Sequence, residues 1–145
     1  MNMVSEDLLN RILDAPVGQV VAVLGEILNC NINLEVIEQN AITPHQFVRK
    51  IVIIANELPV INAYVEFDST VLPESIVSEL LKKKRGVGTI LNIHNIKATR
   101  NVIFFNRNTD ERLVLRKYEI INDGIVWFTI LEEIRLDNLG SNNNS

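Results

Sequence analysis

Two charged residues lie among apolar neighbours in predicted strands, and their types could do chemistry. Arg49 lies in the apolar run of residues 46–54, and Glu132 in the run of residues 126–136. Alternate side chains of a strand point to opposite faces of a sheet, which places Arg49 beside Ile51 and leaves Glu132 as the only polar member of its face. A guanidinium stays protonated, so on an apolar face it must reach water or meet an anion.

Two further arginines fall on largely apolar faces of predicted strands near the end of the chain. Arg100 shares its face with Val102 and Phe104, and Arg116 shares its face with Val114. A lone charge on such a face is the exception in folded proteins, where charged side chains are rarely buried without a partner. These arginines are therefore additional candidates for a buried site.

Two interpretations of these charges remain open from the pattern alone. The pattern favours a buried ion pair between Glu132 and Arg49, Arg100 or Arg116, since ion-pair networks also place charges among apolar residues. The alternative is a closed pocket, in which the planar guanidinium binds the carboxylate of a small acidic ligand. In that pocket the glutamate would contact a hydroxyl group or a proton of the ligand.

Length and composition limit the classes of function. A chain of 145 residues is expected to form one domain with a core of its own. Its 47% of hydrophobic and 22% of charged residues are typical of a soluble globular protein. The net charge of −4 argues against nonspecific binding to nucleic acid or to an anionic membrane, so we expect neither as a partner, and an anionic small molecule is still possible.

Cysteine and histidine provide no metal or redox site. Cys30 is the only cysteine, and His45 and His94 lie far apart in the sequence, so we expect no internal disulfide and no metal site. Residues 1–7 lack the pattern of a signal peptide, and no apolar run reaches membrane-spanning length. The sequence therefore predicts a cytoplasmic protein and gives no indication of its oligomeric state.

The elements that must position these residues can be predicted from hydrophobic periodicity. Helical spacing predicts three helices, over residues 5–13, 20–28 and 73–85. Alternation predicts six strands, over residues 31–36, 46–54, 60–67, 96–106, 112–121 and 125–136. Residues 122–124 predict a hairpin turn between the last two strands. We expect one domain over residues 1–137 and a disordered polar tail over residues 138–145.

Several segments, taken in order, resemble the chorismate lyase-like family, including its short archaeal and cyanobacterial branch. The resemblance covers residues 12–136, although the family usually has threonine where Gly18 stands. The segments are ILDAPVG (12–18), VRKIV (48–52), PVINAY (59–64), VGTIL (87–91), ATRN (98–101) and ILEEI (130–134). It implies an α+β fold, a single domain with an antiparallel sheet of about six strands and flanking helices, which agrees with the predicted strands.

The resemblance also implies an activity. Active members of the family convert chorismate to 4-hydroxybenzoate and pyruvate without a metal or organic cofactor. By this resemblance Arg49 would bind the ring carboxylate, and Glu132 would face the ring hydroxyl. Val17, Val87 and the adjacent Gly88 would line the substrate pocket. Aromatisation supplies much of the driving force, so the protein mainly has to position the substrate and exclude water.

One position departs from the family. Tyr64 stands where some bacterial members have a second arginine, and Arg100 is a candidate to replace it at the second carboxylate. The first hypothesis is therefore a chorismate pyruvate-lyase that makes 4-hydroxybenzoate for a quinone or pterin-type cofactor pathway. The second is a noncatalytic binding or sensor domain for an aromatic acid, since sensor domains of transcription regulators resemble this fold. The third, a purely structural protein, explains the charges only by each other.

Overall fold

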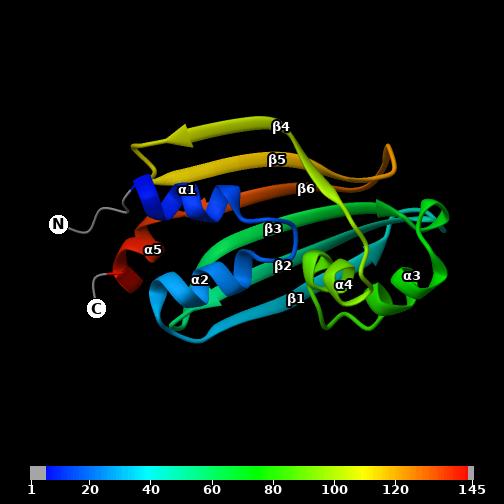
Figure 1. Cartoon of the computed structure of the whole chain (residues 1–145), viewed down its shortest axis with the longest axis horizontal. Coiled ribbons are helices and arrows are strands. Elements are labelled where there is room, and N and C mark those ends of the chain that lie inside the picture. Colours follow the sequence, from blue (N-terminus) through cyan, green and yellow to red (C-terminus); the bar gives the residue numbers. More distant parts are fainter. Residues whose placement is uncertain (1–5, 144–145) are drawn as a thin grey trace.

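Six antiparallel strands form one sheet that runs through the whole molecule (Figure 1). The computed structural model describes residues 6–143, and the side chains of residues 6–139. The order across the sheet is β1-β2-β3-β6-β5-β4, so β1 and β4 are its two edges. The strands are β1 (Ile32–Ala41), β2 (Gln46–Ala55), β3 (Leu58–Asp68), β4 (Thr99–Asn108), β5 (Leu113–Asn122) and β6 (Ile125–Arg135).

Two-residue turns with positive φ angles close two of the hairpins. Asn56 and Glu57 have φ angles of 53° and 72° between β2 and β3. Asp123 and Gly124 have φ angles of 49° and 76° between β5 and β6. Turns of this hand match the twist of the flanking strands, which is why asparagine, aspartate and glycine are preferred in them. The hairpin predicted at residues 122–124 is confirmed.

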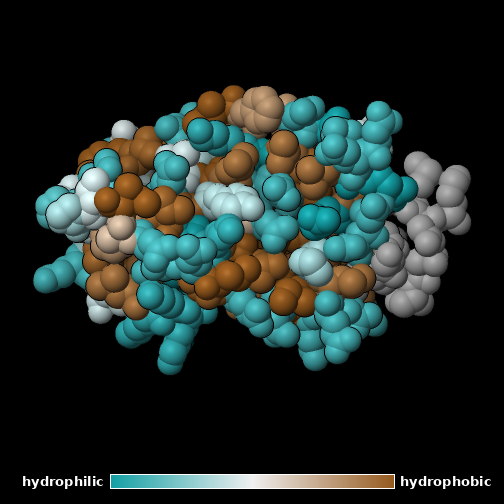
Figure 2. All heavy atoms as spheres, turned by 180° about the vertical axis from the view of Figure 1, so that it is seen from behind, coloured by the Kyte–Doolittle hydropathy of each residue, from teal (hydrophilic) through white to brown (hydrophobic). Residues whose placement is uncertain are grey.

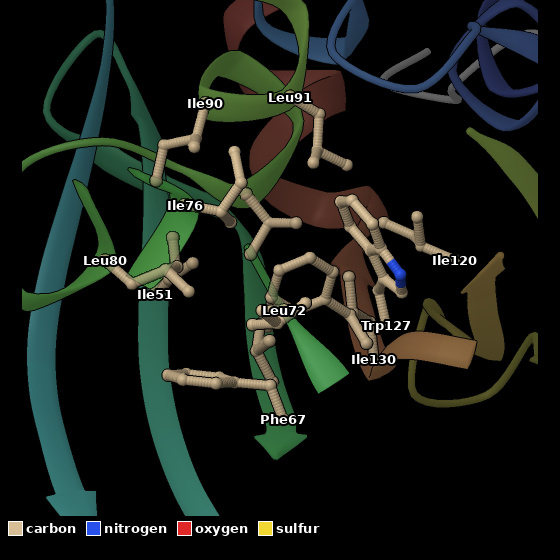
Figure 3. Packing of buried hydrophobic residues seen from close by; sticks show 14 of the residues in the cluster. Ile51, Phe67, Leu72, Ile76, Leu80, Ile90, Leu91, Ile120, Trp127 and Ile130 are labelled. Atoms are coloured by element: carbon tan, nitrogen blue, oxygen red, sulfur yellow. The ribbon is translucent and has the colours of Figure 1, made fainter. Parts of the chain in front are cut away.

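The helices pack against one face of the sheet, which we call the inner face (Figure 1). One part of the core joins α3 and α4 to the sheet, with Ile76 and Leu91 in the same cluster of buried side chains as Ile130 (Figure 3). The other part joins α1, α2 and α5 to the sheet around Ile61 and Ile134. The helical elements are α1 (Glu6–Asp14), α2 (Val20–Leu28), the short η1 (Ser69–Val71), α3 (Glu74–Leu81), α4 (Val87–Ile93) and α5 (Leu136–Asn143).

The opposite face of the sheet, which we call the back face, carries a mixture of polar and apolar side chains (Figure 2). Lys50 and Tyr64 are cross-strand partners there, with the lysine Nζ 5.7 Å from the centre of the tyrosine ring. Because the helices cover the inner face and the back face is mixed, apolar residues alternate with more polar ones along the strands. The predicted α+β fold with a six-stranded antiparallel sheet is confirmed.

Two helices were not predicted. In α4 the positions Val87, Ile90 and Leu91 follow helical spacing and are buried, but the helix has only 7 residues and a glycine in its first turn. In α5 the side chain of Leu139 is fully buried in the core, so the segment after residue 138 begins as part of the fold rather than as a tail. Residues 144 and 145 of the predicted tail, and the predicted helix start at Ser5, lie outside the described residues.

A β-bulge changes the faces of β4. The register shifts between Val102, which is opposite Tyr118, and Phe104, which is opposite Lys117. Tyr118 belongs to the inner face and Lys117 to the back face, so the expectation that Arg100 and Phe104 share a face is wrong. The physical reason is the extra residue, Ile103, because a bulge inserts one residue into the alternation and reverses the side of those that follow.

Candidate functional site

A cavity of about 90 Å³ lies between the inner face of the sheet and the starts of α2 and α4. Its floor includes Ile51, Ala63, Val65 and Ile130, and its polar lining includes Arg100, Tyr118, Thr89 and Glu132. A buried water needs about 10–15 Å³ of such space, so the cavity has room for a small ligand. Binding sites for drug-sized molecules are larger, at roughly 300–1,000 Å³.

Two loops meet above this cavity, and we call them the cavity roof: residues 15–19 before α2 and residues 86–89 at the start of α4. Gly18 has a φ of +88°, and a Cβ atom on it would lie 2.7 Å from the carbonyl oxygen of Gly88. A Cβ atom on Gly88 would lie 2.6 Å from the backbone of Gly18. The backbones therefore touch at a distance that only glycine permits. The contact therefore requires glycine at both residue 18 and residue 88.

Glu132 is held on both of its oxygens by neighbouring side chains. Arg116 donates from Nε to Oε1 at 2.9 Å, and its Nη2 lies 2.8 Å from the same oxygen. Tyr118 donates its hydroxyl to Oε2 at 2.7 Å. All three residues are at most 5% exposed. The ion pair expected from the sequence pattern is thus present, and Arg116 is the arginine that forms it.

Tyr118 stays protonated in this arrangement. Burial raises the pKa of its phenol well above the ordinary value of 10, and the nearby carboxylate of Glu132 raises it further. A neutral phenol can donate to Glu132, whereas a phenolate could not. Tyr118 therefore fixes the carboxylate as an acceptor.

Arg100 is the charged residue of the cavity with unused hydrogen-bonding capacity. Its Nη1 donates to the carbonyl oxygen of Ala15 at 2.7 Å, and its guanidinium carbon lies 4.8 Å from the centre of the Tyr118 ring. Its Nε is buried and has no hydrogen-bond partner. Two guanidinium groups and one carboxylate leave the region with an excess of positive charge. An unpaired buried donor beside that charge favours an anionic ligand.

Arg49 has a different environment from the one expected. It is fully buried, and its Nε donates to Oε1 of Gln39, its cross-strand neighbour, at 2.9 Å. Its two terminal nitrogens donate to the carbonyl oxygens of Arg85, at 2.9 Å, and Leu80, at 3.3 Å. Burial lowers the pKa of Arg49 to about 10, so the group is still protonated at neutral pH. Among the described residues no carboxylate forms an ion pair with it.

The carbonyl groups that accept from Arg49 belong to the end of α3 and the loop after it. The last carbonyls of a helix lack partners within the helix and carry partial negative charge, which a cation offsets. Arg49 therefore holds the loop that leads from α3 into Gly86 and the cavity roof. It does not line the cavity, and the expected contact of its guanidinium with a ligand carboxylate is not provided by this geometry.

The structure brings together most of the predicted site residues. Val17, Val87, Gly88, Arg100 and Glu132 all line the one cavity, although they come from distant parts of the chain.

Tyr64 is the second exception after Arg49. Its neighbours Ala63 and Val65 line the cavity, so alternation sends Tyr64 to the back face, where it pairs with Lys50. It cannot take the place of an arginine in this cavity.

Sequence reasoning missed Tyr118 and the touching glycines. Tyr118 could have been found, since it follows Arg116 by two residues and shares its face. The contact of Gly18 with Gly88 has no such signal, because the two loops are far apart in sequence and meet only through the fold.

A larger cavity of about 390 Å³ lies at the other end of β2, β3 and β6. Its lining includes Phe47, Trp127, Glu66 and Asp68, and none of its lining residues is basic. Carboxylates at the rim repel an acidic ligand, so this cavity does not suit one. The smaller cavity, with Arg100, is the better candidate.

Comparison with known proteins identifies the fold. No family model matches the chain, and no curated protein matches it. The effector domain of PhnF from Mycobacterium smegmatis superposes with a TM-score of 0.55 at 7% identity, over 78% of this chain and 86% of that domain. A possible transcriptional regulator, YydK from Bacillus subtilis, superposes with a TM-score of 0.52 at 13% identity, over 76% of this chain.

This chain spans 61% of the YydK structure and 62% of a longer structure of PhnF, with which it has a TM-score of 0.53. At these identities the likeness concerns the fold alone. Within residues 6–143, no helix is long and apolar enough to cross a membrane, and no group of three acidic, histidine or cysteine side chains could hold a metal ion.

Proposed function

We propose that this protein binds a small organic anion, of the size of a single-ring aromatic acid, in the cavity between the sheet and the cavity roof. The observation that carries the proposal is the buried Nε of Arg100, which has no partner and lies beside an excess of positive charge. The apolar floor around Ile51 and Ile130 would contact the ring of the ligand. Few convergent polar groups in a mostly apolar pocket are typical of small-molecule sites.

The shared fold supports binding without catalysis. One of the similar structures is an effector domain by its own description, and another is a possible transcriptional regulator. The cavity itself also favours binding, because both oxygens of Glu132 already accept from Arg116 and Tyr118. A carboxylate held in this way is poorly placed to take up a proton from a substrate.

A chorismate pyruvate-lyase is the second candidate. Arg100 and Glu132 line the same cavity, as the resemblance to that family requires of an arginine and the glutamate. Chorismate carries two carboxylates, however, and Arg100 is the arginine that lines this cavity. A second carboxylate would have to displace an existing contact of Arg116 or Arg49, which makes binding of a monocarboxylate the simpler function.

Calorimetric titration with 4-hydroxybenzoate tests the proposal. We expect saturable binding by the wild-type protein and at least tenfold weaker binding by Arg100→Gln, since a charge-assisted hydrogen bond contributes about 1.5–3 kcal/mol. The neutral analogue 4-hydroxybenzamide should bind weakly to both. Arg135→Gln, which removes a charge at the exposed end of β6, is the matched control and should bind like the wild type.

Incubation with chorismate separates the two candidates. If the wild type releases pyruvate and 4-hydroxybenzoate and Glu132→Gln does not, the protein is a lyase, and the proposal of binding without catalysis is wrong. Binding of 4-hydroxybenzoate without turnover supports the proposal as stated. Equal binding by the wild type and Arg100→Gln would contradict it.

A further inference from the structure

The two edges of the sheet differ in a way that the cavity does not explain. On the β4 edge, four consecutive apolar residues, Val102 to Phe105, are each 48–53% exposed. On the β1 edge the exposed positions are mostly polar or charged, and include Glu35 and Glu38. Charges and polar side chains on an edge strand discourage pairing with another sheet, whereas an apolar edge invites it. Only β4 has the character of an edge that pairs.

The outer side of β4 presents unpaired backbone groups along its length. Among the described residues the strand pairs with β5 alone, so along its other side the N–H and C=O groups have no strand partner within residues 6–143. It contains no proline and no lysine, the residues that most often block such an edge. In Figure 2 apolar side chains gather along the upper margin of the back face, where β4 lies in Figure 1. Unpaired backbone with exposed apolar side chains favours the addition of a strand.

The sequence of β4 has the same pattern in both directions. It runs from Arg100 and Asn101 through the four apolar residues to Asn106 and Arg107. Turning a copy of the strand end for end therefore places apolar opposite apolar and asparagine opposite asparagine. Such self-complementarity is what a two-fold symmetric interface requires.

The bulge at Ile103 makes this pairing geometrically possible. Residues opposite each other in an antiparallel pair must lie on the same face of the sheet. In a regular strand Val102 and Phe105 would lie on opposite faces, but the bulge places both on the inner face, opposite Tyr118 and Arg116. By the same shift Asn101 and Asn106 both lie on the back face, opposite Glu119 and Leu115.

We propose that two copies of this chain pair their β4 strands in antiparallel fashion about a two-fold axis between Ile103 and Phe104. Val102 of one copy then lies opposite Phe105 of the other, and two six-stranded sheets become one continuous sheet. The assembly closes after two copies because each copy uses the same edge, and the polar β1 edges remain at the two outer ends.

The arginines at the ends of the pattern do not oppose this pairing. Arg107 forms an ion pair with Glu6 of α1, and Arg100 is turned into its own cavity, where it donates to Ala15. The charge of Arg107 is therefore paired within its own copy, and Arg100 faces its own cavity rather than the β4 edge. Because Arg100 belongs to β4, the pairing would also place the two cavities on either side of the joined strands.

Sedimentation velocity over a wide range of protein concentration tests the proposal with a matched pair of variants. Ile103→Lys places a charge at the bulge of the β4 edge, whereas Ile37→Lys places the same charge at the bulge of the β1 edge, where Ile37 is 61% exposed. We expect a dimer for the wild type and Ile37→Lys and a monomer for Ile103→Lys. A monomeric wild type, a dimeric Ile103→Lys or a larger oligomer would overturn the proposal.

Amide hydrogen exchange provides a second measurement that needs no variant. The amides of residues 99–108 that do not pair with β5 should be protected in the dimer, and this protection should fall as the protein is diluted. If Ile103→Lys does not fold, this measurement on the wild type still shows whether the dimer contact lies on β4. Free exchange of those amides in a dimeric sample would show that the contact lies elsewhere and would overturn the assignment to β4.

Discussion

Arg49 and Arg116 are both buried on the inner face of the sheet, but their charges are compensated in different ways. Arg116 meets a full negative charge on Glu132 and also donates to the carbonyl oxygen of Leu13. Arg49 meets neutral acceptors, the side chain of Gln39 and two carbonyl groups near the end of α3. A charge among apolar residues therefore identified one ion pair and one helix-end contact, and neither of them is a ligand site by itself.

The two arginines nevertheless have a common consequence for the cavity. Arg116, together with Arg100, holds the end of α1 and the loop that leads to Gly18. Arg49 holds the loop that leads to Gly88. The two loops meet at the glycine contact of the cavity roof. The cavity is thus closed from two sides by loops that buried arginines fix to the sheet.

The largest effect is expected where a full charge loses its partner. Arg116→Met leaves Glu132 buried, with Tyr118 as its remaining donor, and should lower the free energy of unfolding by about 3–5 kcal/mol. Urea denaturation measures this loss. The double variant Arg116→Met/Glu132→Leu removes both charges and should recover most of it. If the double variant is no more stable than Arg116→Met, the loss of stability does not come from the unpaired carboxylate, and the ion pair itself stabilises the fold.

A smaller effect is expected at the other arginine. Arg49→Met leaves the acceptors on Gln39, Leu80 and Arg85 without their donor, and neutral acceptors cost less to leave unpaired than a carboxylate. We expect a loss of about 2 kcal/mol in the same denaturation experiment. A loss equal to that of Arg116→Met would remove the distinction drawn between the two sites.

Much of the fold and part of the site could be predicted from the sequence. Alternation correctly assigned six strands, and it placed Glu132 and Arg116 on inner faces before their pairing was known. It could not show which arginine meets Glu132, because that depends on the order of the strands, in which β5 lies beside β6 and β2 lies two strands away. The partners of Arg49 were also hidden, since a carbonyl group at the end of a helix leaves no mark in the sequence.

Local irregularities account for the remaining differences. The bulge at Ile103 adds one residue to the alternation of β4, so a strict period of two assigned Phe104 to the wrong face. In α4 the glycines at residues 86 and 88 obscured a short helical pattern. Both irregularities lie next to the features proposed to carry function, the β4 edge and the cavity roof.

The contact between the two held loops can be broken directly. Gly88→Ala places a Cβ atom 2.6 Å from the backbone of Gly18, so the loops must separate. We expect a loss of about 1 kcal/mol or more in stability and weaker binding of 4-hydroxybenzoate. Gly25→Ala in α2 is the matched control, since its Cβ would meet nothing closer than 3.6 Å and alanine favours the helix. If Gly88→Ala binds 4-hydroxybenzoate with unchanged affinity, the contact between the two loops of the cavity roof does not contribute to binding.

The smallest expected effect is on how steeply the stability of the fold falls at alkaline pH. Burial, and then the charge of Glu132, raises the pKa of Tyr118 in the folded protein above the value of about 10 in the unfolded chain. Above pH 10 the unfolded chain has lost the phenol proton while the folded protein retains it, so the stability contributed by Tyr118 falls as the pH rises. The slope should be about 1.4 kcal/mol per pH unit at most.

Thermal unfolding between pH 8 and pH 11, compared between the wild type and Tyr118→Phe, isolates this contribution, because the other titrating groups are common to both proteins. We expect the wild type to lose stability more steeply above about pH 10. Equal slopes for the two proteins would mean that the phenol of Tyr118 is not held in its neutral form by the Glu132 site, and the contrast with Arg49 would then rest on Arg116 alone.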